Sequence, residues 1–348
     1  MMGKDRILYP FLWIAASIML IISATPAYSQ SKLRVVETRK IYDNHSYCAF
    51  TSLVKFQDKY YCTFREASRH HIQFNDPATW GRIVLLESTD AKEWNKVAEF
   101  SQDSTDMRDP KVKVTPDGKR LMLLYHKHRI YSNKQTGGHS VVRLFDGSGF
   151  SAEEQRIKVK GYENERLILW NVTIYKKKIQ GFVSGTKFMY VTSKDGVNFE
   201  ALSDLTDWAR DNQGMNESNV AFIGRKAYAV VRSTVDQGYL GESRYPFKKW
   251  KWKKMNISLG GPNLYKLNNS TLLLGSRDYG RDNNRGKTAI YELTKNHWNE
   301  AEKNVILEST NDSSYPCFIE IDKKHLLVSY YSGEATHSNI YISELVIE

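Results

Sequence analysis

The sequence predicts an all-β fold, and three observations lead to that prediction. Helical periodicity is almost absent, while short apolar or alternating segments rich in Tyr, Val, Ile, Phe and Trp recur along the chain. Tight turns join these segments in pairs, as at Gln57-Asp58, Gly224-Arg225 and Asn268-Asn269. The pairs recur at a spacing of roughly fifty residues, which is typical of a repeated unit of about four strands.

Six such pairs form the regular part of the chain. They are Cys48–Phe56 with Lys59–Arg65, Asp109–Val114 with Arg120–His126, Leu169–Tyr175 with Lys178–Ser184, Glu217–Ile223 with Lys226–Arg232, Gly261–Leu267 with Thr271–Arg277, and Tyr315–Ile321 with His325–Tyr331. Further strands are expected to complete the units at Arg82–Ser88, Met189–Ser193, Thr288–Leu293 and Asn339–Glu344.

Six units of this kind predict a six-bladed β-propeller. The remaining strand, Leu33–Lys40, would complete the last blade and close the ring, so that no long strand edge stays open. A five-bladed ring is the alternative, because the stretches 126–160 and 233–255 are difficult to divide into strands.

The first 29 residues are predicted to be a signal peptide. Lys4 and Arg6 give a basic start, Phe11 to Ala24 form an apolar run that is short for a membrane span, and Ala27-Tyr28-Ser29 offers small residues for cleavage. An uncleaved signal anchor is the alternative. We expect residues 30–348 to be one propeller domain, exported to the periplasm or secreted, with no membrane span after cleavage.

The charge of the chain favours acidic partners. Its formal net charge is +11, of which Lys4, Asp5 and Arg6 contribute +1. A basic exported protein suits acidic glycans rather than nucleic acid. Three cysteines, Cys48, Cys62 and Cys317, cannot all pair within one chain, so buried thiols are expected instead of a disulfide framework.

No cofactor or metal is expected. His70, His71, His126 and His128 lack companion ligands at a convincing spacing, and the chain has no glycine-rich phosphate loop.

Polar residues recur at one edge of the predicted hairpins. The start of the first strand and the end of the second lie at the same edge of an antiparallel pair. If all inner strands begin on one face, that face collects Thr51, Asp109, Asn171, Glu217, Asn263 and Tyr315, together with Arg65, His126, Ser184, Arg232, Arg277 and Tyr331. Three arginines, two acids and tyrosines are costly to bury unpaired, so this face is predicted to hold a functional site.

Several motifs on these edges have a family likeness. They are Asn216-Glu217-Ser218 followed by Val231-Arg232-Ser233, Ser314-Tyr315 with Tyr330-Tyr331, Asp109-Pro110 with Thr115-Pro116-Asp117-Gly118, and Phe64-Arg65-Glu66-Ala67-Ser68. Taken in their order along the chain, they resemble the motifs of the bacterial sialidase (neuraminidase) family over nearly all of residues 30–348. Two turns, Ser88-Thr89-Asp90 ending at Trp94 and Ser193-Lys194-Asp195-Gly196 ending at Phe199, resemble the Asp boxes that mark its blades, although both are one residue short.

The resemblance implies an exo-acting retaining glycoside hydrolase that releases a terminal acidic sugar, sialic acid first among them. Tyr315 would be the nucleophile, Glu217 its base and Asp76 the general acid, with His70, His71 and Asp109 as rivals for the last role. The substrate-binding candidates are Arg232, Arg277, Arg65, Asp109, His70 and Arg285, the last as an alternative to Arg277.

These residue types suit that chemistry. A carboxylate nucleophile would be repelled by the carboxylate on the anomeric carbon of a sialic acid, whereas a neutral phenol is not. A phenol does not ionise unaided near neutrality, so it needs a base such as Glu217. Arginine binds a carboxylate through two parallel charge-assisted hydrogen bonds.

One departure from the family puts the sugar in doubt. The family begins its first blade with an arginine in a Phe-Arg-Ile-Pro motif, whereas this chain reads Ala49-Phe50-Thr51-Ser52. Arg65, at the same edge of that blade, is expected to replace the missing arginine. Two alternatives therefore stay open: a propeller hydrolase or lyase for a uronic or other acidic sugar, and a glycan-binding propeller without catalysis.

Overall fold

The computed structural model describes residues 32–348 apart from 132–133, 136, 146–148, 152 and 281. The described residues belong to one compact unit, Ser31–Glu348. The predicted signal peptide, residues 1–29, lies outside them. No helix among the described residues is long and apolar enough to cross a membrane.

The strands form five sheets. The largest has the order β24 (Asp312–Glu320), β25 (His325–Glu334), β26 (His337–Ile347), β2 (Tyr47–Phe56), β3 (Lys59–Ala67), β4 (Arg82–Ser88) and β5 (Asn95–Phe100), with β1 (Leu33–Tyr42) paired to β26. The second contains β6 (Thr105–Val114), β7 (Leu121–Tyr131), β9 (His139–Phe145) and β10 (Gln155–Arg156), with β8 (Lys134–Gln135) paired to β7.

The other three sheets follow along the chain. The third contains β12 (Leu167–Tyr175), β13 (Lys178–Gly185), β14 (Met189–Ser193), β15 (Asn198–Asp204) and β11 (Lys158–Val159). The fourth contains β16 (Ser218–Ile223), β17 (Lys226–Val231), β18 (Tyr239–Arg244) and β19 (Trp250–Lys254), and the fifth β20 (Asn263–Lys266), β21 (Thr271–Arg277), β22 (Thr288–Thr294) and β23 (Glu302–Ile306). The helices described are the short η1 (Pro77–Thr79) and α1 (Thr206–Asn212).

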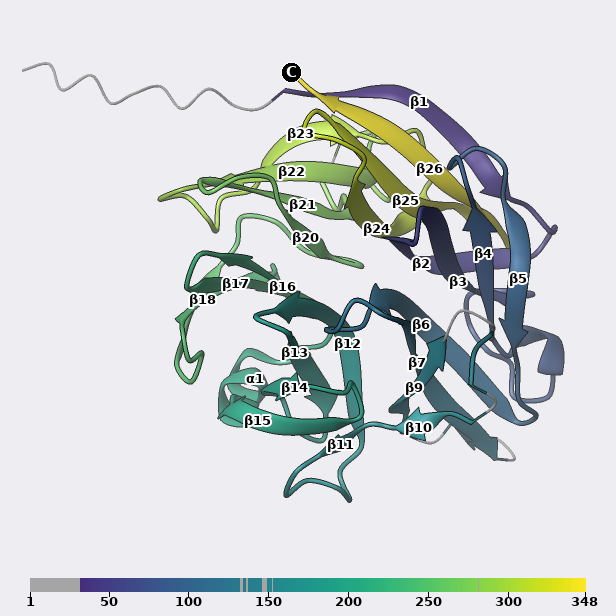
Figure 1. Cartoon of the computed structure of the whole chain (residues 1–348), viewed down its shortest axis with the longest axis horizontal. Helices are drawn as coiled ribbons and strands as arrows, with labels where there is room; N and C mark the ends of the chain where they lie inside the picture. The colour runs from purple at the N-terminus through teal and green to yellow at the C-terminus, as the bar shows by residue number, and fades with distance from the viewer. Residues whose placement is uncertain (1–31, 132–133, 136, 146–148, 152, 281) are drawn as a thin grey trace, which may run out of the picture. The chain divides into compact units, whose positions relative to one another are not determined.

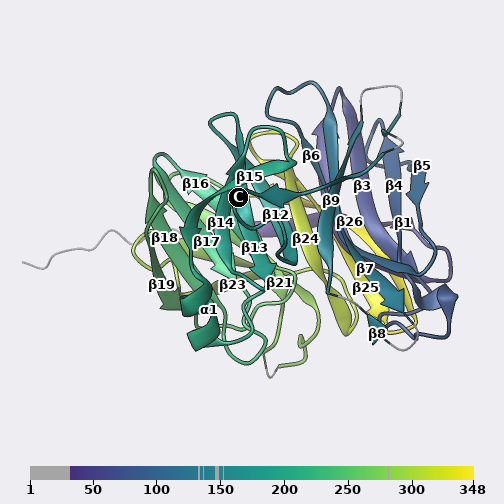
Figure 2. The ribbon, with the colours of Figure 1, turned by 90° about the horizontal axis from the view of Figure 1, so that it is seen from below.

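The predicted all-β class is confirmed, and the sheets have a propeller-like arrangement. All six predicted inner hairpins are present as antiparallel pairs. Figure 1 shows the sheets side by side around a common centre, with the first strand of each hairpin nearest to it. In the view turned by 90°, the strands run between the same two faces of the ring (Figure 2).

The ends of the chain close this arrangement. β1 pairs antiparallel with β26 from Leu33 opposite Ile347 to Tyr42 opposite Ile340, which confirms the role predicted for Leu33–Lys40. β26 meets β2 at a single parallel bridge, Tyr47 to Ser338. The eight-stranded sheet therefore consists of two four-stranded groups, one ending in β26 with β1 and one beginning at β2.

Apolar clusters lie between neighbouring sheets. One contains Phe182 and Tyr190 of the third sheet with Val220 and Ala229 of the fourth. Among the described residues, five more such clusters join the other neighbours, including the two groups of the eight-stranded sheet. Burial of apolar side chains between sheets is therefore the main force that holds each sheet to the next.

The three cysteines and the two turns that resemble Asp boxes can be compared with the sequence analysis. Cys48, Cys62 and Cys317 are free and buried, as expected. In both turns that resemble Asp boxes, the carboxylates of Asp90 and Asp195 accept hydrogen bonds from the amides two and three residues later.

The seam between β26 and β2 gives a first testable prediction. Ser338 Oγ accepts a hydrogen bond from the Cys48 amide at 3.0 Å and donates one to the Cys48 carbonyl at 2.7 Å. Ser338→Ala leaves the buried amide without this partner, so the free energy of unfolding should fall by about 1–3 kcal/mol in a denaturant titration. Ser101→Ala, at an exposed serine, should change it by less than about 0.5 kcal/mol. Equal stability of the two variants would count against a structural role for the seam.

Candidate active site

A cavity of about 330 Å³ opens where the inner strands begin. Its walls come from the edge of the hairpins on which polar residues were predicted to gather. The lining residues that matter below are Phe50, His70, His71, Arg108, Asp109, Trp170, Glu217, Arg232, Gly261, Arg277, Tyr279, Tyr315 and Tyr331.

β-Bulges direct several of these side chains. The register shifts at the same place in β2, β6, β12 and β24, where two residues of the inner strand have no regular partner on the second strand. Phe50, Asp109 and Tyr315 lie in three of these bulges with φ of 67°, 49° and 54°. Non-glycine residues rarely adopt positive φ, and such strained positions gather at functional sites.

Glu217 is the centre of one hydrogen-bond network. Its Oε1 accepts hydrogen bonds from the Tyr315 hydroxyl at 2.7 Å and from Arg232 Nη1 at 2.6 Å, and its Oε2 accepts one from the Gly261 amide at 2.6 Å. These three partners come from three different segments of the chain, which meet Glu217 at the cavity. The carboxylate is therefore held in one orientation against the phenol.

The electrostatics of this pair keep the phenol protonated. Burial raises the pKa of Tyr315 well above its ordinary value, and the carboxylates of Asp109 and Glu217 raise it further. Burial alone would lower the pKa of Arg232, but the charge of Glu217 raises it, so the guanidinium stays charged. Tyr315 can become a nucleophile only by passing its proton to a base, and Glu217 is in direct contact with it.

Asp312 is the centre of a second network. Its carboxylate accepts hydrogen bonds from Arg277 Nη2 at 2.5 Å, the Tyr331 hydroxyl at 2.9 Å and the Tyr47 hydroxyl at 2.9 Å, and it lies 3.5 Å from His70 Nδ1. Burial alone would raise the pKa of Asp312, but the hydrogen bond from His70 and the charge of Arg277 hold it well below its ordinary value.

Asp109 is buried beside Tyr315. Its Oδ2 lies 3.7 Å from His126 Nδ1, and its Oδ1 has no hydrogen-bond partner among the described residues. Burial would raise its pKa, but contact with His126 lowers it below the ordinary value. The ammonium group of Lys111 lies 5.5 Å from the centre of the Tyr315 ring. It donates hydrogen bonds to the backbone carbonyls of Asp109 and Pro110.

Phe50 and Arg108 line one part of the cavity. Phe50 lies in the Ala49-Phe50-Thr51-Ser52 stretch, which has no arginine where the sialidase motif Phe-Arg-Ile-Pro has one. The Phe50 ring lies 4.7 Å from the Tyr315 ring, and the Arg108 guanidinium lies 6.0 Å from the Phe50 ring. Arg108 also donates to Asp106 at 2.5 Å and to the His70 carbonyl at 2.9 Å. A cation is thus present in this part of the cavity, but it comes from β6.

The structure brings together seven of the ten residues named from the sequence. They are Tyr315, Glu217, Arg232, Arg277, Asp109, His70 and His71.

The prediction that Arg65 is a substrate-binding residue of the cavity is wrong. Its side chain is fully buried and donates to Asp106, at 2.9 Å from Nη2, and to the carbonyls of Arg69 and Thr79. It is not among the residues that line the cavity, because all its donors face this buried carboxylate and backbone. Arg65 therefore supports the wall behind Arg108 and does not replace the missing arginine.

Asp76 and Arg285 also lie outside the cavity lining. The Asp76 carboxylate accepts a hydrogen bond from the Ala78 amide at 3.0 Å and caps η1. This is the turn role that an Asn-Asp-Pro sequence favours. Arg285 is exposed and lines a neighbouring hollow that shares Arg232 and Tyr279 with the cavity.

Four residues were missed by sequence reasoning. Arg108, Trp170 and Tyr279 line the cavity, and Asp312 orients its arginine and histidine. The Asp109-Pro110 pair was the available signal for Arg108, because proline removes a ladder hydrogen bond and favours a bulge.

Among the described residues, one group has the ligand types of a metal site. Ligand atoms of Asp43, His45 and His337 lie within 4.8 Å of one another at the surface, away from the residues that line the cavity. Asp43 is already bound to Lys40 at 2.6 Å, so we assign this group no role.

Known proteins are similar to this chain in structure. No protein-family model matches the sequence, and no curated protein does. A protein of unknown function from Dyadobacter fermentans matches with a TM-score of 0.74 at 20% identity, over 91% of this chain and 100% of that one. The NanB sialidase of Streptococcus pneumoniae matches with a TM-score of 0.65 at 10% identity, over 88% and 70%.

An α-L-arabinofuranosidase, Arb93A of Fusarium graminearum, matches with a TM-score of 0.62 at 12% identity, over 89% of this chain and 97% of that one. At these identities the likeness shows the fold alone. The fold of the chain is therefore similar to that of these proteins, two of which are glycoside hydrolases.

The Asp312 network gives a pH prediction. A carboxyl group whose pKa is lower in the folded state stabilises the fold above its unfolded pKa of about 3.9, and this contribution is lost as the pH falls below that value. Asp312→Asn should lower the free energy of unfolding at pH 7 by about 1–3 kcal/mol and should reduce the loss between pH 7 and pH 3. Asp58→Asn, at an exposed turn, is the control. A wild-type pH dependence in the Asp312 variant would contradict the assignment.

Proposed function

We propose that this protein is an exo-acting retaining glycoside hydrolase in which Tyr315 is the nucleophile and Glu217 its base. The observation that carries the proposal is the 2.7 Å hydrogen bond from the Tyr315 hydroxyl to the Glu217 carboxylate within a cavity. The glycoside hydrolases among the structural neighbours support the reaction class.

The proposed reaction has two steps. In the first, the Tyr315 oxygen attacks the anomeric carbon while Glu217 takes the phenol proton, and a proton donor protonates the departing glycosidic oxygen. In the second, the former donor, now a base, removes a proton from water, which attacks the same carbon. The tyrosine oxygen leaves and recovers its proton from Glu217, so the enzyme is restored.

We assign the proton donor to His70. Its ring lines the cavity, and Tyr47 at 2.6 Å and Asp312 at 3.5 Å both lie at Nδ1. This orientation leaves Nε2 as the nitrogen available to give a proton to the departing oxygen and to take one from water. Asp109 lines the same cavity, but its lowered pKa makes it a poorer acid for this step.

The proposed substrate carries a terminal acidic sugar, sialic acid first among them. Arg108, Arg232 and Arg277 reach the cavity from three different sheets and can present guanidinium groups to a carboxylate. Arg108 takes the place that the sequence suggested for Arg65.

A neutral sugar is the second candidate. Each of the three arginines already has a carboxylate partner, in Asp106, Glu217 and Asp312 respectively. This internal pairing reduces the positive charge available to a bound anion. The similarity to an α-L-arabinofuranosidase gives the class of neutral glycoside to test.

We further propose that the ring has six blades and that residues 1–29 direct export. Counting the two groups of the eight-stranded sheet separately gives six units, four with four strands and two with five, joined by six apolar clusters among the described residues. The single bridge between β26 and β2 supports this division.

Tyr315→Phe tests the nucleophile. It removes the attacking oxygen, so kcat on a fluorogenic sialoside should fall by at least about a thousandfold, while binding of the substrate persists. Tyr265→Phe, which removes a hydroxyl bonded to Glu320 at the surface, should keep wild-type activity.

The turnover of the variant and the choice of substrate by the wild type distinguish the hypotheses about function. Unchanged turnover in Tyr315→Phe would rule out the proposed nucleophile. Release from 4-nitrophenyl α-L-arabinofuranoside but not from the sialoside would favour the neutral sugar. Binding of acidic sugars without release would favour a glycan-binding propeller.

His70→Gln tests the proton donor. Substrates with poor leaving groups need protonation, whereas 4-nitrophenolate departs without it. The variant should therefore lose about a hundredfold in kcat/KM on an alkyl glycoside and much less on the 4-nitrophenyl glycoside of the same sugar. Equal losses on both substrates would indicate a role in binding or folding only.

A further inference from the structure

A basic groove crosses the fourth sheet and extends toward the fifth. Two hollows of about 570 and 580 Å³ share Lys226, Glu242 and Arg244, so they form one continuous depression, called here the lysine groove. Five lysine or arginine residues line the first hollow and three more the second, against Glu242 as the acid of the lining.

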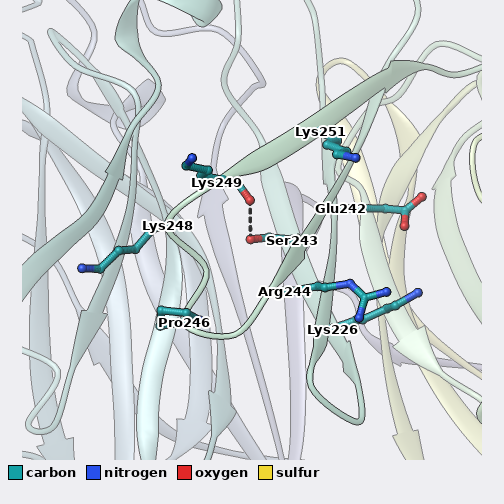
Figure 3. Close-up of a pocket in the computed structure, with 8 residues that line it drawn as sticks. All are labelled: Lys226, Glu242, Ser243, Arg244, Pro246, Lys248, Lys249 and Lys251. Atoms are coloured by element: carbon teal, nitrogen blue, oxygen red, sulfur yellow. Dashed lines mark hydrogen bonds between the residues drawn. The ribbon is translucent and has the colours of Figure 1, made fainter.

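The cations of the groove lie in register across the strands. Lys226 of β17 is directly opposite Arg244 of β18, and Glu242 of β18 is opposite Lys251 of β19. Figure 3 shows the side chains of these four residues extending from the strands in the same direction. No salt bridge joins Lys226, Arg244 or Lys251 to a carboxylate among the described residues. Lys226 and Arg244 are like charges placed directly opposite each other, an arrangement that is unfavourable in a sheet.

Protection of a sheet edge accounts for only part of this pattern. Lysines on an outer strand such as β19 discourage pairing with another chain. Lys226 and Arg244, however, lie on β17 and β18, which have strand partners on both sides. The two positive charges that face each other here therefore point to an anion that is bound at the groove.

The groove is separate from the cavity. The ladder between β16 and β17 runs from Ser218 opposite Val231 to Ile223 opposite Lys226. Glu217 and Arg232 flank the first end of this ladder, whereas Lys226 and the turn at Arg225 form the other end. A ligand in the groove thus leaves the cavity open.

We propose that the lysine groove binds a polyanionic polysaccharide, whose sulfate or carboxylate groups recur along the chain. A recess suits a thin chain, because Lys226 is only partly exposed and lies between neighbouring cations. A flat membrane surface would reach the protruding lysines but not this recess. The inference does not depend on the proposed catalytic function, since it concerns different residues.

Binding of the full chain to immobilised heparin tests the proposal. The variant Arg244→Gln/Lys251→Gln/Lys253→Gln removes three charges of the groove, and we expect about tenfold weaker binding and elution at lower salt. The matched control, Lys92→Gln/Lys160→Gln/Lys324→Gln, removes three exposed charges elsewhere and should change the affinity by less than about twofold. Thermal unfolding of both variants shows whether they are folded.

Two results would overturn the proposal. Equal weakening in the groove variant and the control would mean that heparin responds to net charge alone. Stronger binding of the wild type to phosphatidylserine vesicles or to duplex DNA than to heparin, lost in the groove variant, would assign the groove to another class of polyanion. Tyr315→Phe should bind heparin as the wild type does, so failure of the catalytic proposal leaves this test intact.

Discussion

The β-bulges at the start of the inner strands are the constraint on which the cavity depends. In a regular strand, successive side chains point to opposite faces, so neighbouring residues cannot share one cavity. The bulge inserts an extra residue and turns the strand, which lets both Arg108 and Asp109 line the same wall. Positive φ at Asp109 and Tyr315 is strained by about 1–3 kcal/mol each, and the hydrogen bond between Tyr315 and Glu217 helps to offset it.

Charge pairing is the second organising feature. Three arginines and three acids would each be costly to bury alone, whereas each pair is tolerated because its partners are close and hydrogen-bonded. Arg277 with Asp312 and Arg232 with Glu217 therefore fix the side chains before any sugar binds. The same pairing limits how much positive charge the arginines can offer to a bound carboxylate.

Strand pairs and turns depend on local sequence patterns, and these features were predicted accurately from the sequence. All six inner hairpins follow from alternation and turn residues, and the contact between Glu217 and Tyr315 follows from placing hairpin ends on one face. Arg65 was misassigned because an edge position does not determine where a long side chain points, and here it reaches the buried Asp106. Arg108 was missed because its place in the cavity depends on a bulge, for which the Asp109-Pro110 pair was the one sequence signal. Asp312 was missed because its role depends on partners far along the chain, which leave no local pattern.

In the fourth sheet, one ladder separates a surface with paired charges from a surface with unbalanced positive charge. Its register places Glu217 and Arg232 at one end, where each charge is compensated by a partner. The same register places Lys226 opposite Arg244 at the other end, where the described residues supply no salt bridge to either. The strands between them are held by a continuous set of hydrogen bonds and by apolar packing on both faces. Because such strands deform little, the two ends keep separate surroundings, a cavity at one end and a groove at the other.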